Sequence, residues 1–305
     1  MKKFLFSIVL LGTISLASLL VYDRINLNWM IRTMPSEIEK MERLFGEVKT
    51  ERVAIFGSSR ASSHYIPEFI DNDAYNYGLS GSAMNETLFL IRQRLKHFKE
   101  GIIIINLDPS SFNKGWDDIK QCPFRGEYRL VGLRPSVFSC LPKGVVSLDD
   151  VIPGVRFWGE LRPKLARDKN VPIEHIQGAQ VVDEVLEECV WEERCAHASA
   201  FEFQIGPEVQ PVLDELYRIA SPGVRFVWVA SPLAPCYDTK AKGLDGMLEF
   251  MKRQAEYSTV SYLTFLNTLP RYDRLECKDP YHLNKAGAIR FSKELREHLS
   301  LLRQK

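Results

Sequence analysis

Short apolar runs alternate with longer stretches of mixed apolar and polar positions along most of this chain. Runs of about five apolar residues are typical of buried strands, and they fall at Arg52–Phe56, Ala74–Asn76, Ile102–Asn106, Arg225–Ala230 and Ser261–Phe265. The mixed stretches have the spacing of helices that bury one face, and they fall at Ala83–Lys99, Glu208–Ala220, Lys240–Glu256 and Asn284–Leu299. This alternation predicts an α/β domain over residues 51–305, with a central parallel sheet of about five strands and helices on both faces.

The alternation breaks down in the middle of the chain, at about residues 112–205. This stretch contains Trp116, Trp158 and Trp191, several prolines and four cysteines. A long irregular insertion usually serves a function or is disordered, and its aromatic residues argue against disorder. We therefore predict that this stretch forms a lid or specificity region beside a functional site. Its tryptophans could stack on sugars, although core packing is the commoner use of tryptophan.

The N-terminus carries a charge-free apolar run. Lys2 and Lys3 precede Phe4–Tyr22, which is longer than the ~7–15 apolar residues of a signal peptide and close to the ~20 that span a membrane. Residues 1–25 are therefore expected to form an N-terminal transmembrane helix with its lysines on the cytoplasmic side. Cleavage as a signal peptide after Ala17 is the alternative. Residues 26–50 are expected to form a linker helix.

The composition excludes several classes of function. The 305 residues include 40 Lys and Arg against 39 Asp and Glu, so no strong positive field favours nucleic acid as a partner. No zinc-type spacing of Cys and His and no glycine-rich phosphate loop occurs in the sequence. We therefore expect neither a metal site nor a cofactor.

Six cysteines fit an exported protein. An even number in an oxidising compartment favours disulfides, and the sequence alone leaves about 15 ways to pair them. Proximity along the chain favours the pairs Cys122–Cys140, Cys189–Cys195 and Cys236–Cys277. The last pair would hold the loop just before Asp279. Buried free thiols are the alternative.

Two distant patches together predict a nucleophilic active site. Gly57-Ser58-Ser59 ends the first strand, and Asp279-x-x-His282 precedes the last helix. A serine becomes a nucleophile when a base takes its proton, and the base needs a third group to orient it. An aspartate three residues before a histidine lies on the same side of a turn. The alternative is that the serines only cap a helix.

These patches resemble a known family. Gly57-Ser58-Ser59, Asn76–Gly81 and Asp279-x-x-His282-Leu283-Asn284 resemble blocks I, II and V of the SGNH (GDSL-like) hydrolases. The resemblance covers about half the chain. It is greatest to the membrane-anchored branch that includes alginate O-acetylation and DltD-type proteins, and it implies a flavodoxin-like three-layer sandwich.

The resemblance also implies roles for individual residues. The nucleophile falls on Ser59, the base on His282 and the acid on Asp279. The backbone N–H groups of Ser59 and Gly81 would bind the oxyanion.

The chain departs from the family pattern after the third strand. Leu107 stands where the family carries an asparagine that donates to the oxyanion. Loss of one such donor can cost about 10²–10³ in rate. Either Asn106 or Asn85 donates instead, or the protein is slow or inactive.

Three further residues lie next to the proposed site in sequence. Arg60 could bind an anionic group of the substrate or pair with a carboxylate such as Asp108. Asn284 is a second candidate for substrate binding. His64 is expected to face solvent from a loop, and the alternative is that it touches the site.

The first functional hypothesis is a serine esterase or O-acyltransferase that acts on acyl esters of cell-envelope polysaccharide. The apolar N-terminus would anchor it in the membrane with its catalytic domain outside the cytoplasm, in the periplasm or at the cell surface. Acyl transfer would require a donor such as a multi-spanning membrane acyltransferase. The second hypothesis is a catalytically inactive scaffold that binds glycan or such an acyltransferase. The third is an assembly protein in which the three residues coincide by accident.

Overall fold

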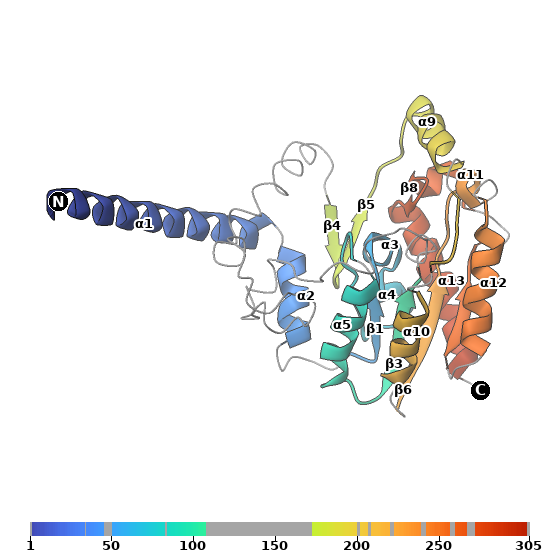
Figure 1. Ribbon diagram of the computed structural model, residues 1–305. Coiled ribbons are helices and arrows are strands. Elements are labelled where there is room, and N and C mark those ends of the chain that lie inside the picture. Colours follow the sequence, from blue (N-terminus) through green and yellow to red (C-terminus); the bar gives the residue numbers. More distant parts are fainter. Residues whose placement is uncertain are drawn as a thin grey trace. The chain divides into compact units, whose positions relative to one another are not determined.

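Parallel strands form the centre of the α/β part of the chain (Figure 1). The computed structural model describes residues 2–33, 35–45, 51–82, 84–107, 173–199, 202–206, 209–219, 223–238, 242–256, 260–266 and 272–303. The chain divides into two units. One unit comprises Met1–Met41 and Phe124–Asn170, and the other comprises Glu42–Pro123 and Val171–Lys305.

The N-terminal region is helical. Helix α1 (Lys2–Thr33) contains 32 residues, and α2 (Pro35–Phe45) follows it. Within the described ranges, we find no helix with both the length and the apolarity that crossing a membrane requires. The transmembrane helix predicted for residues 1–25 is therefore not shown and stays a prediction.

All five predicted strands are present, with ends within one residue of those predicted. They are β1 (Val53–Phe56), β2 (Ala74–Asn76), β3 (Gly101–Asn106), β6 (Val224–Ala230) and β7 (Ser261–Thr264). They form one parallel sheet in the order β2-β1-β3-β6-β7. This is the strand order of a flavodoxin-like, doubly wound sheet, and its direction of winding changes between β1 and β3. Ligands of such sheets bind at the carboxyl ends of the strands beside that point.

Helices cover both faces of the sheet. The four predicted helices correspond to α5 (Met84–Leu95), α10 (Val209–Arg218), α12 (Leu244–Glu256) and α13 (Lys285–Arg303). Two short helices, α3 (Ser59–His64) and α4 (Pro67–Ile70), join β1 to β2. Both of them pack against α13, whereas α5 and α10 contact each other.

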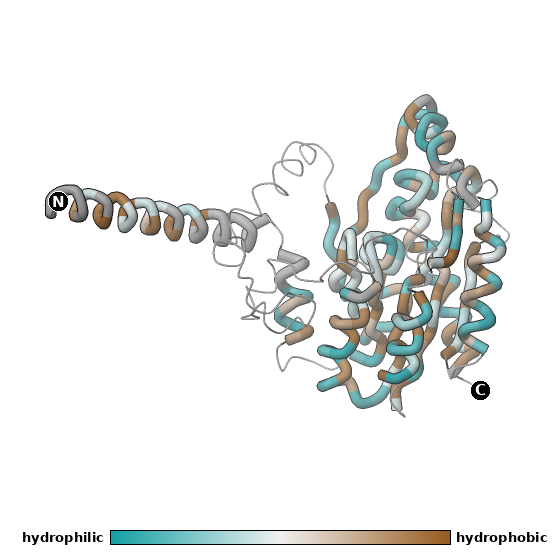
Figure 2. The backbone as a smooth tube through the Cα atoms, viewed as in Figure 1, coloured by the Kyte–Doolittle hydropathy of each residue, from teal (hydrophilic) through white to brown (hydrophobic). Residues whose placement is uncertain are grey.

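The alternation of side chains along the strands explains this layering. Val227 and Val229 of β6 belong to a buried cluster with Phe291 of α13. Trp228, between them, stacks on Tyr217 of α10 with ring centroids 5.6 Å apart. Because successive strand residues point to opposite faces, the sheet is buried on both sides. Figure 2 shows hydrophobic residues along these strands and a mixture along the covering helices.

Two described segments of the predicted insertion have regular structure, so the prediction of an irregular stretch is wrong for residues 173–182 and 188–199. Strands β4 (Ile173–Ile176) and β5 (Ala179–Val182) form an antiparallel hairpin, and α9 (Glu188–Ser199) follows it. Gln177, at the tip of the hairpin, has a positive φ of 46° and accepts a hydrogen bond from the Asn76 N–H at 3.0 Å. The hairpin therefore packs at the end of β2. Residues 108–172, with Trp116 and Trp158, lie outside the described ranges.

A buried ion pair ties α5 to the start of the sheet. The Arg94 guanidinium donates to both carboxylate oxygens of Glu51, at 2.7 Å each, and both side chains are almost fully buried. We expect Glu51→Gln to lower the free energy of unfolding by about 3–5 kcal/mol, because it leaves a buried guanidinium without its counter-charge. Urea unfolding followed by circular dichroism measures this loss.

The matched control is the exposed pair Glu249 and Arg253 of α12, whose closest charged atoms lie 3.8 Å apart. Glu249→Gln should cost less than about 0.5 kcal/mol, because water screens an exposed pair. Equal losses of unfolding free energy in the two variants would show that the buried pair stabilises the fold no more than the exposed pair does.

Candidate active site

The predicted nucleophile lies at the carboxyl end of β1. The strand ends at Phe56, and Gly57 turns the chain with a φ of +142°, a region that favours glycine. A Cβ atom on Gly57 would lie only 2.9 Å from the Cβ of Ala61 and 3.0 Å from that of Asn106. The tight turn makes Ser59 the first residue of α3 and leaves it half-buried at the edge of the sheet.

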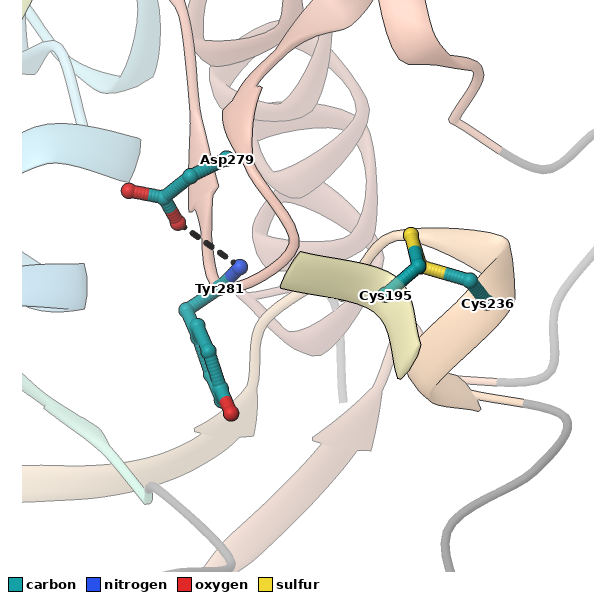
Figure 3. The surroundings of a disulfide bond; sticks show 4 residues. All are labelled: Cys195, Cys236, Asp279 and Tyr281. Atoms are coloured by element: carbon teal, nitrogen blue, oxygen red, sulfur yellow. Dashed lines mark hydrogen bonds between the residues drawn. A yellow bond between two sulfur atoms is a disulfide. The ribbon is translucent and has the colours of Figure 1, made fainter. Parts of the chain in front are cut away.

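The predicted acid and base come from one small hairpin. Strands β8 (Cys277–Asp279) and β9 (His282–Leu283) pair in antiparallel fashion between the 3₁₀ helix η4 (Arg274–Glu276) and α13. The Asp279 Oδ1 atom accepts hydrogen bonds from the N–H groups of Tyr281 at 2.9 Å and His282 at 3.0 Å. Figure 3 shows the bond to Tyr281. The carboxylate therefore orders the same turn that carries the histidine.

The three residues form a continuous chain of hydrogen-bonding distances. His282 Nδ1 lies 2.9 Å from Asp279 Oδ1 and 3.0 Å from Oδ2. His282 Nε2 lies 2.9 Å from the Ser59 hydroxyl oxygen, across 223 positions of sequence. The structure thus brings together the predicted nucleophile, base and acid, and their catalytic roles stay a prediction.

The charge on Asp279 determines the direction of these bonds. Burial alone would raise the pKa of its carboxyl, but the hydrogen bond and charge of His282 and the N–H groups of Tyr281 and His282 hold the pKa below its usual value. An ionised carboxylate only accepts hydrogen bonds, so Nδ1 of His282 carries the proton and donates it. Nε2 is then free to accept the proton of the Ser59 hydroxyl, as a general base must.

A second histidine, His64, lies directly behind the first. The prediction that His64 faces solvent is wrong, because the side chain is fully buried at the end of α3. Its Nε2 accepts the N–H of Leu283 at 3.1 Å, so its Nδ1 carries the proton and donates it to the Ser231 hydroxyl at 3.1 Å. Burial, followed by the charges of Arg60 and His282, lowers its pKa well below the usual value. A neutral His64 therefore links the nucleophile's helix to the hairpin of the base.

Arg60 makes structural contacts in this arrangement, and its contact with substrate stays a prediction. Its side chain is buried, and its guanidinium donates to the carbonyl of Ser231 and to that of Pro232 at 3.0 Å. The alternative partner, Asp108, lies outside the described residues.

Asn284 is also structural, in place of the predicted substrate contact. Its Oδ1 accepts the Gly287 N–H at 3.1 Å, and its side-chain amide donates to the Leu275 carbonyl at 2.6 Å. An asparagine that accepts from the third residue of a helix is an N-cap. Asn284 therefore starts α13 and anchors the loop before the hairpin.

Two backbone groups and one side chain bear on oxyanion binding. The N–H of Ser59 begins α3, so no carbonyl within that helix accepts it. Gly81 is exposed with a φ of +71°, and the Leu79 N–H donates to the Gly57 carbonyl at 3.0 Å, which brings this loop beside the nucleophile's turn. Asn106 lies in the core, where its Oδ1 accepts the Tyr65 hydroxyl at 2.7 Å. The predicted role of Asn106 as a donor is therefore not supported.

Leu107 and Asn85 are the two remaining residues for which the sequence predicted a bearing on the oxyanion. Leu107 is fully buried. The side chain of Asn85 lies outside the described ones.

The cysteines pair differently from the prediction. Cys195 of α9 is bonded to Cys236 of α11 (Pro235–Asp238), with Cα atoms 5.6 Å apart (Figure 3). Cys277 is a buried free thiol in the apolar core, and burial raises its pKa to about 12. The pairs Cys189–Cys195 and Cys236–Cys277 are therefore wrong, because α9 packs on α11 while Cys277 points into the core. Cys122, Cys140 and the side chain of Cys189 lie outside the described positions.

The described part of the chain contains no group of three or more His, Cys, Asp or Glu side chains that could hold a metal ion. The His282 side chain contacts the Asp279 carboxylate through one ring nitrogen and the Ser59 hydroxyl through the other. The chemistry open to this arrangement is proton transfer and nucleophilic attack by the serine.

Comparison with known proteins leaves the family open. No family model and no curated protein matches the chain. Among solved structures, a Streptococcus pneumonia protein provisionally named as a platelet activating factor is 10% identical, with a TM-score of 0.43 over 90% of this chain and 97% of that one. A Bacteroides fragilis protein provisionally named as an acylhydrolase is 10% identical, with a TM-score of 0.41 over 87% and 95%.

A gut microbial diltiazem-metabolizing enzyme is also 10% identical, with a TM-score of 0.37 over 82% of this chain and 48% of that one. Similarities at these TM-scores and identities identify neither a family nor a function for this chain.

The neutral His64 predicts how stability depends on pH. In the unfolded chain a histidine takes up a proton near pH ~6.5, whereas folded His64 stays neutral to lower pH. The unfolded state then binds more protons, so the free energy of unfolding falls as the pH drops below about 6.5, by at most about 1.4 kcal/mol per pH unit for one group. We expect His64→Gln to flatten this dependence in urea unfolding between about pH 7.5 and 5.5.

The control is His97→Gln, because His97 is exposed. That variant should keep the pH dependence of the wild type. A wild-type slope in His64→Gln would mean that other groups cause the dependence. A change in stability at neutral pH alone decides nothing, since the slope is the quantity compared.

Proposed function

We propose that this protein is an extracytoplasmic serine esterase or O-acyltransferase that acts on acyl esters of cell-envelope polysaccharide. The observation that carries the proposal is the chain of short contacts from the Ser59 hydroxyl through His282 to the Asp279 carboxylate. It lies at the carboxyl end of the sheet, beside the point where the winding changes direction. The sequence motifs around these residues, which resemble SGNH hydrolases, support the same chemistry.

The proposed reaction proceeds in two steps. The Ser59 oxygen attacks the acyl carbonyl while His282 Nε2 takes the hydroxyl proton, and Asp279 stabilises the imidazolium that forms. The backbone N–H groups of Ser59 and Gly81 bind the oxyanion. His282 then gives its proton to the departing alcohol, which leaves an acyl ester on Ser59. Water or a sugar hydroxyl, activated by the same imidazole, takes the acyl group in the second step.

Two features support a location outside the cytoplasm. Disulfides such as Cys195–Cys236 persist mainly in oxidising compartments. The apolar run at Phe4–Tyr22 has the length of a membrane anchor or export signal. A membrane-anchored enzyme at the periplasmic or cell-surface side would meet envelope glycans, and for transfer it would receive acyl groups from a multi-spanning membrane acyltransferase. The insertion would act as a lid or specificity region over the serine.

A second candidate is a non-catalytic scaffold of the same fold that binds glycan or a membrane acyltransferase. The observation that favours it is Leu107, which is fully buried at the position of the family's asparagine donor. With one donor missing, the oxyanion would depend on backbone groups alone. The two candidates differ in whether Ser59 is reactive.

Covalent labelling tests that difference. We expect a fluorophosphonate probe to modify the full-length protein at Ser59, located by mass spectrometry, and Ser59→Ala to abolish the labelling. His282→Ala should slow it by at least about 10³-fold, because a serine without its base is a poor nucleophile.

The matched control is Ser58→Ala, which removes the neighbouring hydroxyl and leaves the three proposed catalytic residues in place. Its labelling should stay within a few-fold of the wild type. Absence of labelling in folded wild-type protein would contradict the esterase proposal and favour the scaffold. Labelling at Ser58 would contradict the assignment of the nucleophile.

A further inference from the structure

An arginine from the insertion reaches the proposed catalytic acid. Arg194 lies on α9, and its Nη1 atom is 3.8 Å from Asp279 Oδ2. The other carboxylate oxygen, Oδ1, already accepts the two backbone N–H groups of the turn. The Asp279 side chain is 12% exposed and that of Arg194 is 41% exposed. The partly exposed guanidinium therefore has one nitrogen within ion-pair distance of the mostly buried carboxylate.

The next residue along α9 fixes this helix covalently. Cys195 is bonded to Cys236 of α11, 41 positions further along the chain. Figure 3 shows the disulfide near the turn that Asp279 and Tyr281 form. The segment before α11 also contacts that turn, because the Ala234 N–H donates to the Pro280 carbonyl at 3.2 Å. The disulfide thus ties α9 to the segment that supports the catalytic hairpin.

We infer that Arg194 is a positioning residue of the catalytic triad, held beside Asp279 by the Cys195–Cys236 disulfide. This inference rests on the proposed function. A positive charge at this place opposes the uptake of a proton by the Asp279–His282 pair. It adds to the contacts with His282 and Tyr281 that keep the carboxylate ionised, and it favours the form of the imidazole that can act as a base. The disulfide thereby extends the activity of Ser59 to lower pH.

His64, Cys277 and Tyr281, whose charges would act on Asp279 or His282, stay neutral at neutral and mildly acidic pH. On α3, Arg60 is a permanent cation, and burial lowers the pKa of His64 well below its usual value. On the hairpin, burial raises the pKa of the Cys277 thiol to about 12 and raises that of the Tyr281 hydroxyl, so both stay neutral. Arg194 is therefore the charge that a single exposed substitution can remove without disturbing the core.

The rate at which the fluorophosphonate probe labels Ser59 is measured as a function of pH. The acid limb of this profile, where the rate falls as the pH drops, reports proton uptake by the Asp279–His282 pair as a unit. We expect Arg194→Gln to move that limb to higher pH by about 0.5–1 unit, a modest shift because water screens a partly exposed cation. Arg194→Lys should restore most of the wild-type profile, since it keeps the charge. At about 1 M salt the difference between wild type and Arg194→Gln should shrink.

The disulfide is tested in the same assay. A dithiol breaks the Cys195–Cys236 bond, gives two electrons and two protons to the two sulfurs, and becomes a disulfide itself. Because a reductant acts on every disulfide, the variant Cys195→Ser/Cys236→Ser serves as the specific test. It should shift the acid limb in the same direction as Arg194→Gln. If the disulfide acts through Arg194, adding the cysteine changes to Arg194→Gln should produce no further shift.

Two readouts separate this inference from the proposed function. Labelling of Ser59 by the fluorophosphonate probe at the pH of maximal rate tests the proposed esterase or acyltransferase function. All measurements use the full-length protein. An NMR titration of the His282 ring follows proton uptake by the pair whether or not Ser59 is reactive. The melting temperature of each variant, with assays well below it, ensures that the folded protein is compared.

The control is Arg253→Gln on α12, which removes an exposed arginine that pairs with Glu249. Its titration and acid limb should match those of the wild type. An Arg194→Gln variant whose His282 titration is unchanged would overturn the inference. So would an equal shift from the cysteine changes in the presence and absence of Arg194.

Discussion

One buried, neutral histidine supports the alignment of Ser59 and His282, the proposed nucleophile and base. His64 ends the short helix that Ser59 begins, and it accepts the N–H of Leu283, the residue after the base. Its other nitrogen donates to Ser231, which directly follows strand β6. If this ring took up a proton, Nε2 could no longer accept the Leu283 N–H, and a cation would lie in the core beside His282. The hydrogen bond from Leu283 to His64 therefore holds the hairpin in place, and it is lost when His64 takes up a proton.

The segment that follows β6 extends this support. Its carbonyls at Ser231 and Pro232 receive the guanidinium of Arg60, and the Ala234 N–H holds the Pro280 carbonyl in the turn between acid and base. Its end, Cys236, is bonded to α9 of the insertion. One short stretch of chain thus contacts the nucleophile's helix, the catalytic hairpin and the insertion. Three parts of the sequence that are far apart meet there, two through hydrogen bonds and the third through the disulfide.

Local patterns predicted the sheet and the spacing of Asp279 and His282, because strand burial and a three-residue turn are properties of neighbouring residues. They could not predict the role of His64 or Arg60. Helix α3 is too short for a periodic signal, and the hydrogen-bond partners of these two side chains lie more than a hundred residues away. The cysteine pairing failed for a similar reason. Proximity in sequence said nothing of how α9 packs on α11, nor that Cys277 would point into the core.

The buried polar residues around the site also weigh between the two proposed functions. A buried guanidinium and a buried imidazole are costly to desolvate, and apolar side chains of similar size would stabilise a fold as well or better. Yet Arg60 and His64 direct their hydrogen bonds to the segment after β6 and to the hairpin that carries the base. A scaffold that only presents a surface has no need of this arrangement. A site that must hold Ser59 and His282 at hydrogen-bonding distance does need it, and on this argument the catalytic proposal outweighs the missing oxyanion donor at Leu107.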